Sequence, residues 1–167
     1  GTLTKRICHC DTKVNNMMFD ENDNVLCVID LDTVMPGSSL YDFGDSIRFG
    51  ANTAAEDETD LSKVTLSLEY FKAYVDGYLE AAGESLTDNE IKYLAFSAKL
   101  LTFECGIRFL ADFLDGDVYF KTEYPEHNLV RARTQFKLVA DIEAKYDAMM
   151  SIVEESASTI LKNRKIF

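Results

Sequence analysis

The chain has 167 residues and a formal net charge of −12, from 17 basic and 29 acidic side chains. This excess of negative charge disfavours nucleic acid and anionic membrane surfaces as partners. A hydrophobic content of 47% and only two prolines and eight glycines predict one globular domain and exclude a disordered chain. No apolar run approaches the roughly 20 residues of a membrane span. Four scattered cysteines predict reduced thiols and a cytoplasmic location.

The first fifty residues are predicted to be rich in strands and loops. Apolar runs indicate strands at 6–9, 16–19 and 25–29, and the turn formers at 20–24 join the last two into a hairpin. The numbers of facing residues should then sum to about 45. This register places Asn16 opposite Ile29 or Asp30.

The rest of the chain is predicted to be helical, which gives an α+β, mainly α-helical fold. Helices are expected at 66–82, ended by Gly83, then at 87–114 and at 127–162. Thr87 and Glu90 fit a capping box at the start of the second helix. The acidic run at 56–60 is expected to be a solvated loop.

Polar side chains gather at one end of the predicted hairpin. Asp11 lies on the loop that enters this end, and Asn16 and Asp30 lie on the two strands. Two carboxylates and a carboxamide are oxygen ligands that suit Mg²⁺, together with substrate phosphates. A carboxylate kept free of the metal can accept a proton from a hydroxyl nucleophile.

The sequence His9-Cys10-Asp11, with Asn16 five residues later and Ile29-Asp30-Leu31-Asp32 beyond, resembles a known catalytic loop and metal turn. It is similar to the aminoglycoside phosphotransferase and choline kinase-like superfamily, relatives of protein kinases that phosphorylate small-molecule hydroxyls. Asp11 would then orient or deprotonate the acceptor hydroxyl, and Asn16 and Asp30 would hold Mg²⁺ on the phosphates of ATP. His9 would form hydrogen bonds within the loop.

Two further positions belong to this resemblance. Cys10 stands where the family usually has glycine. The segment 41–45 is similar to the one after the metal turn, where an aspartate, here Asp42, braces the catalytic loop. Asp32 is either a second metal ligand or a charge on the loop.

The segments 46–50, 104–109, 119–121 and 127–135 are similar to a narrower branch, the N-acetylhexosamine 1-kinases. These enzymes place a phosphoryl group on the anomeric hydroxyl of GlcNAc or GalNAc. The resemblance implies that Phe49 packs on the sugar and Arg108 binds its polar edge. From the residues alone, Phe49 can equally fill the core, Arg108 can form a buried ion pair with Glu104, and His127 can simply start a helix.

The resemblance covers only the C-terminal half or so of the family's chain. No G-x-G-x-x-G or G-x4-G-K-[ST] motif for phosphate binding occurs. Residues 1–167 are therefore expected to form a single domain, the C-terminal lobe of a kinase-like phosphotransferase without its nucleotide lobe, and to be inactive alone. Residues 1–50 would hold the catalytic loop and metal hairpin, and 51–167 the substrate-binding helices. The apolar surface left uncovered by the missing lobe would allow a dimer to form through that face.

Three alternatives accompany this interpretation. Residues 28–34 also match the opening motif of haloacid dehalogenase-like phosphatases, in which Asp30 would be the nucleophile and Asp32 the acid or base. That fold needs further parallel strands, where this chain shows a helical pattern. The others are an aminoglycoside- or choline-type kinase and a noncatalytic kinase-like module that binds a sugar or a partner.

Overall fold

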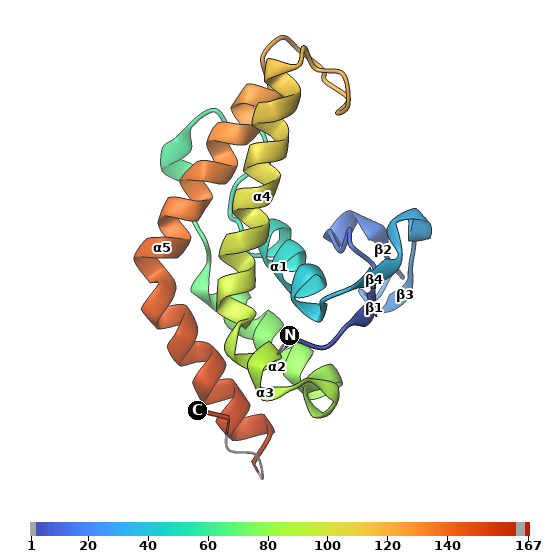
Figure 1. The fold of residues 1–167 in the computed structure, drawn as a ribbon, viewed down its shortest axis with the longest axis vertical. Coiled ribbons are helices and arrows are strands. Elements are labelled where there is room, and N and C mark those ends of the chain that lie inside the picture. Colours follow the sequence, from blue (N-terminus) through green and yellow to red (C-terminus); the bar gives the residue numbers. More distant parts are fainter. Residues whose placement is uncertain (1–2, 163–165) are drawn as a thin grey trace.

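The computed structural model describes residues 3–162 and 166–167 (Figure 1). Four short strands come first, followed by five helices: β1 (Arg6–Cys8), β2 (Met17–Phe19), β3 (Val25–Val28), β4 (Met35–Gly37), α1 (Ser39–Gly50), α2 (Leu68–Ala82), α3 (Asp88–Lys92), α4 (Leu94–Leu114) and α5 (His127–Ile160). The fold is α+β and mainly helical, as predicted. Figure 1 shows the strands grouped on one side of the helical body, next to α1. No helix in the described part is long and apolar enough to cross a membrane.

The predicted hairpin is confirmed. Met17 faces Val28 and Met18 faces Cys27, so their numbers sum to 45, and a bulge follows at Phe19. Beyond the last pair, the N–H of Ile29 donates to the carbonyl of Asn16 over 2.9 Å. The predicted register therefore places Asn16 and Asp30 at the same end of the hairpin, as the structure does.

A second antiparallel pair joins β1 and β4. The sequence predicted β1 but not β4. Ile7 faces Pro36 and Cys8 faces Met35. The run Met35-Pro36-Gly37 is typical of a turn, and proline is tolerated here because a two-stranded sheet has only edge strands. Both described sheets are antiparallel and two-stranded. Residues 3–162 therefore do not form the parallel sheet that the phosphatase alternative requires.

Helix α1 corrects the expectation of strands and loops up to residue 50. The Ser38 hydroxyl caps it by accepting the N–H of Leu40, and Leu40, Phe43 and Ile47 give it a buried stripe. Gly44 makes this helix hard to predict from the sequence, because glycine is unfavourable inside a helix. The glycine is required because any β-carbon at this position would collide with the Ser97 carbonyl of α4.

The other helices match the prediction with two corrections, the break in the region 87–114 and the end of α5. The region 87–114 is two helices that break at Tyr93, although the capping box of Thr87 and Glu90 is present. Helix α2 ends at Ala82 with Gly83 as its C-cap, as predicted, and a short 3-10 turn over Gly83–Ser85 follows. Helix α5 runs unbroken over 34 residues and ends at Ile160.

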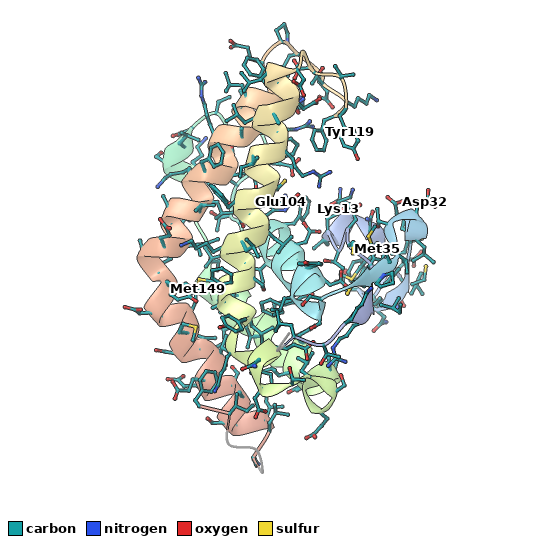
Figure 2. The ribbon with its side chains drawn as sticks, viewed as in Figure 1. Lys13, Asp32, Met35, Glu104, Tyr119 and Met149 are labelled. Atoms are coloured by element: carbon teal, nitrogen blue, oxygen red, sulfur yellow. The ribbon has the colours of Figure 1, made fainter. Side chains whose placement is uncertain are left out.

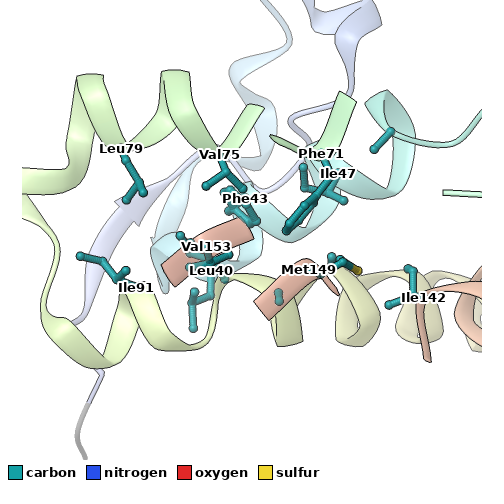
Figure 3. Packing of buried hydrophobic residues seen from close by; sticks show 14 of the residues in the cluster. Leu40, Phe43, Ile47, Phe71, Val75, Leu79, Ile91, Ile142, Met149 and Val153 are labelled. Carbon is teal, nitrogen blue, oxygen red and sulfur yellow. The ribbon is translucent and has the colours of Figure 1, made fainter. Parts of the chain in front are cut away.

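The core lies between α1, α2, α4 and α5 (Figure 3). Phe43 of α1 is fully buried at its centre, with the rings of Phe71 and Tyr78 of α2 at 6.3 and 5.1 Å. Helix α5 contributes Ile142, Met149 and Val153 from the opposite side. This packing fixes α1, and α1 carries Asp42, which holds the loop 9–16, the predicted catalytic loop.

Candidate active site

The loop 9–16 is fastened to α1 by the side chain of Asp42. One carboxylate oxygen of Asp42 accepts the N–H of His9 over 2.9 Å, and the other accepts the N–H of Cys10 over 2.8 Å. The Thr12 hydroxyl donates to the carbonyl of Asp42 over 2.6 Å. Asp42 therefore lies where the expected brace of the loop should lie, and it binds the two successive peptide N–H groups on either side of His9.

Asp11 has two donors around its carboxylate. Lys13 Nζ lies 3.0 Å and Asn16 Nδ2 2.9 Å from the same oxygen, Oδ2. Burial raises the pKa of Asp11, but the hydrogen bonds from Lys13 and Asn16 outweigh it, so that the pKa lies below its ordinary value. Asp11 is therefore ionised at neutral pH and can accept a proton. Sequence analysis missed Lys13, whose signal is its spacing of two residues from Asp11.

Asn16 and Asp30 lie at the same end of the hairpin. Asn16 is buried. Its carbonyl accepts the N–H of Ile29, which is the residue directly before Asp30. His9 Nε2 lies 2.9 Å from the carbonyl of Ile29, which ties the catalytic loop to this turn. Asp30 has a left-handed backbone, with φ of 61°, and Asp30 and Asp32 are both exposed.

A cleft of about 850 Å³ lies between the catalytic loop, α1, α4 and the loop 115–126. Figure 2 shows Glu104 and Tyr119 on the α4 side of this region and Lys13 on the strand side. Asp11, Phe49 and Arg108 all line the cleft, so the structure brings these three predicted residues together. Asn16 and Asp30 do not line it, because Asn16 is buried and Asp30 lies on an exposed turn.

Arg108 is not in a buried ion pair. Its nitrogen lies 3.7 Å from a Glu104 oxygen, and both side chains are 50% exposed. The Arg108 guanidinium instead lies 5.9 and 5.4 Å from the ring centres of Tyr119 and Phe120. It is therefore a solvent-accessible donor on an aromatic surface.

A network of charges around the buried Arg48 forms another wall of the cleft and was missed by sequence analysis. Arg48 binds Asp45 over 2.9 Å and Glu56 over 3.0 Å, and Arg131 of α5 lies 3.7 Å from Glu56. Burial lowers the pKa of the Arg48 guanidinium, but the acidic side chains around it reverse this effect and raise the pKa overall. The prediction that residues 56–60 are only a solvated loop is wrong for Glu56. A visible signal was Arg48 itself, a cation in the apolar run Ile47-Arg48-Phe49.

The aromatic side of the cleft is held by Asp112, at the end of α4. Its carboxylate accepts the N–H groups of Val118, Tyr119 and Phe120 over 3.0, 2.7 and 2.9 Å. His127 has a comparable structural role, since its buried ring stacks on Tyr124 and lies 3.3 Å from Asp57. His127 is also the first residue of α5, as one of the two sequence interpretations expected.

Comparison with known families adds to this geometry. The phosphotransferase enzyme family matches residues 2–86, which cover all four strands, the catalytic loop, α1 and α2. The chain belongs to this family. The match supports the aminoglycoside phosphotransferase and choline kinase-like superfamily and a kinase-like enzyme. Members of this phosphotransferase family generally use ATP and Mg²⁺.

Proposed function

We propose that this phosphotransferase transfers a phosphoryl group from ATP to a neutral amino sugar, at the anomeric hydroxyl of an N-acetylhexosamine such as GlcNAc or GalNAc. Residues 1–167 would form one catalytic and acceptor-binding unit. Its partners would be the small-molecule acceptor and a nucleotide. The lobe that binds ATP would be a separate part of the enzyme.

The charge balance of the cleft carries this proposal. Its lining has five cations, Lys13, Arg48, Arg108, Lys121 and Arg131, and four carboxylates, Asp11, Asp45, Glu56 and Glu104. The sum is 5 − 4 = +1, in a chain whose net charge is −12. Asp11, Asp45 and Glu56 each have a Lys or Arg nitrogen at 2.9–3.0 Å, and Glu104 forms only a loose pair with Arg108 at 3.7 Å. An aminoglycoside would need uncommitted carboxylates, and choline would need an aromatic cage free of other cations. Because the Arg108 guanidinium already lies over the Tyr119 and Phe120 rings and would repel a cation, the cleft favours a neutral acceptor.

The remaining lining suits a sugar. Phe49 is half-buried and presents an apolar surface, and Tyr119 and Phe120 form an edge-to-face pair with ring centres 4.8 Å apart. A neutral sugar binds through such aromatic surfaces together with a few directed hydrogen bonds. Arg108 would supply donors to a hydroxyl or to the acetamido oxygen.

Asp11 would orient the acceptor hydroxyl and take its proton. Its ionised carboxylate lies on the cleft, and the bonds from Lys13 and Asn16 fix its direction. The Lys13 ammonium is close enough to Asp11 to stabilise negative charge that develops during transfer. His9 would support this arrangement through its contact with the turn that carries Asp30.

The donor atoms near the hairpin end fit Mg²⁺. Asn16 uses its amide nitrogen on Asp11, which leaves its amide oxygen, and the Asp30 carboxylate is exposed. Among the described residues no three His, Cys, Asp or Glu side chains cluster as a metal cage. One carboxylate and one amide oxygen fit an ion that takes its other ligands from water and phosphates. Bound there, Mg²⁺ would neutralise charge on the phosphates, with Asp32 either as a further ligand or as a loop charge.

Saturation-transfer NMR on the 167-residue chain tests the acceptor class. We expect GlcNAc or GalNAc to show binding, choline and kanamycin to show none, and Arg108→Gln to weaken the sugar signal at least about tenfold. In the full-length enzyme, Asp11→Asn should lower kcat by at least about 100-fold while nucleotide binding stays nearly unchanged. Phosphorylation of the amines without any turnover of the sugars would overturn the acceptor but leave the phosphotransferase class standing.

A further inference from the structure

Helix α4 is apolar on two opposite faces, but the described structure covers only one. Its buried face includes Ala95, Ala98, Thr102 and Phe109. The opposite face has a stripe that we name the α4 seam, which consists of Tyr93, at the break just before α4, and of Phe96, Leu100, Phe103, Ile107, Leu110 and Leu114. Leu110 is half-buried and the other six are 39–74% exposed. The Phe103 ring lies 6.1 Å from the Phe136 ring of α5, but 46% of Phe103 stays exposed. A helix that is apolar on both faces is normally buried on both, so the exposed part of the seam lacks a partner.

The seam contrasts with the neighbouring long helix. Among the described residues, α5 exposes no large hydrophobic side chain to this degree. In Figure 1 no other element crosses in front of α4 along its length. The apolar exposure is therefore a property of one face of one helix and not of the helical body in general.

The spacing of the seam specifies the kind of partner. Successive members lie three, four, three, four, three and four residues apart, from Tyr93 to Leu114. This is the 3-4 repeat of the two apolar positions in a coiled-coil heptad, kept over three heptads. Such a stripe packs against another helix with the same repeat, at a small crossing angle.

The charges beside the seam fit a second copy of α4 in parallel orientation. Lys99 and Glu104 take the two flanking heptad positions and lie five residues apart, the offset at which flanking charges of parallel helices meet. Their side chains are 35% and 50% exposed. An antiparallel crossing centred at Phe103 would instead bring Glu104 of both copies together. We propose that two copies of the chain associate through their α4 seams, with Lys99 of each facing Glu104 of the other.

The existing partners of these charges leave room for this contact. Lys99 lies 2.7 Å from Glu143 of its own chain, and an ammonium group has three donors, so it can bind a second carboxylate. Glu104 lies 3.7 Å from Arg108, a loose pair that is easily exchanged. Because Leu100 and Glu104 also line the acceptor cleft, the second copy would lie beside the mouth of the cleft.

Sedimentation equilibrium of the 167-residue chain tests the association. We expect a reversible dimer, and Phe103→Glu should raise its dissociation constant at least about 100-fold, because each dimer would bury two added charges. Leu26→Glu on β3, at a site that is 61% exposed, is the matched control and should leave the dimer intact. Circular dichroism checks that both variants keep their helix content. A chain that stays monomeric, or a dimer lost in Leu26→Glu but not in Phe103→Glu, overturns the proposal.

Cysteine cross-linking tests the parallel orientation. Equivalent seam residues face each other in a parallel pair, so Phe96→Cys in a Cys27→Ser background should form a covalent dimer on oxidation. Val118→Cys, at an exposed site away from the seam, is the control and should cross-link far more slowly. Glu104→Lys should weaken the dimer, most strongly at low salt. A seam-dependent dimer that Phe96→Cys does not cross-link would exclude the parallel arrangement.

Discussion

The strand segment at 3–37 and the helical body at 38–162 are stabilised by different interactions. In the strand segment Cys8 is the only apolar side chain that is buried among the described residues, and twelve large hydrophobic side chains are exposed. The helical body has a continuous core around Phe43, Phe71 and Met149. The proposed catalytic and metal-binding residues therefore lie on the part of the molecule with the least hydrophobic stabilisation.

At the junction of these two regions, polar contacts instead of a hydrophobic core attach the strand segment to the helices. Asp42 of α1 holds the catalytic loop, and Glu90 of α3 binds Arg6 of β1 over 2.6 Å and the Ser39 hydroxyl over 2.8 Å. Both carboxylates belong to helices that pack in the body. A segment fastened in this way is expected to open locally at a lower free energy than the body unfolds.

The largest effect is expected in the core. Phe43→Ala removes a fully buried ring and should lower the free energy of unfolding by about 3–5 kcal/mol. Leu26→Ala on the exposed hairpin should change it by no more than about 0.5 kcal/mol. Urea denaturation followed by circular dichroism measures both. Similar losses from the two variants would remove the distinction between the regions.

Glu90→Gln should give the next largest loss, about 2–3 kcal/mol at neutral pH, because it breaks the junction of Arg6 with a fully buried carboxylate. The hydrogen bond from Arg6 lowers the pKa of Glu90 to about 2, below its ordinary value of 4.5. This stabilisation is present above about pH 4.5 and is lost as the pH falls toward 2. Unfolding measured from pH 7 to pH 2.5 should show a shallower decline in Glu90→Gln. An identical decline in both proteins would contradict the role of Glu90.

Asp42→Asn should act mainly on the strand segment. Its amide cannot accept both the His9 and the Cys10 N–H, so one hydrogen bond of about 1–2 kcal/mol is lost. Hydrogen exchange at the amides of β2 and β3 should become about tenfold faster, while exchange in α5 stays unchanged. Asp32→Asn, at an exposed position, is the control. Equal acceleration in α5 would mean that the segment and the body unfold together.

The smallest effect is expected at Cys10, whose φ of 65° is left-handed. Cys10→Gly removes the β-carbon that strains this conformation and should stabilise the chain by up to about 1 kcal/mol. Cys10→Ala keeps the β-carbon and should give no such gain. Thermal unfolding of the two variants measures the difference, and a gain in Cys10→Ala alone would exclude backbone strain as the cause.

Local patterns determined much of this protein. The hairpin register, the capping box of Thr87 and Glu90, and α2 all follow from residues close together in the sequence. The spacing of Asp11 and Asn16 also places them correctly, because five residues of one loop bring the amide within 2.9 Å of the carboxylate. Short-range hydrogen bonds and side-chain periodicity are enough for such features.

Tertiary packing decided the rest. Helix α1 was missed because Gly44 is needed only where α1 meets Ser97 of α4, a contact that the sequence does not show. Glu56 was expected in solvent, but Arg48 and Arg131, from two different helices, draw it to the wall of the cleft. The buried guanidinium of Arg48 needs charged partners, and the half-buried Glu56 lies 8 residues from Arg48 and 75 from Arg131 along the chain. The sequence could therefore suggest the reacting groups, whereas the charge of the cleft that surrounds them depends on how the helices pack.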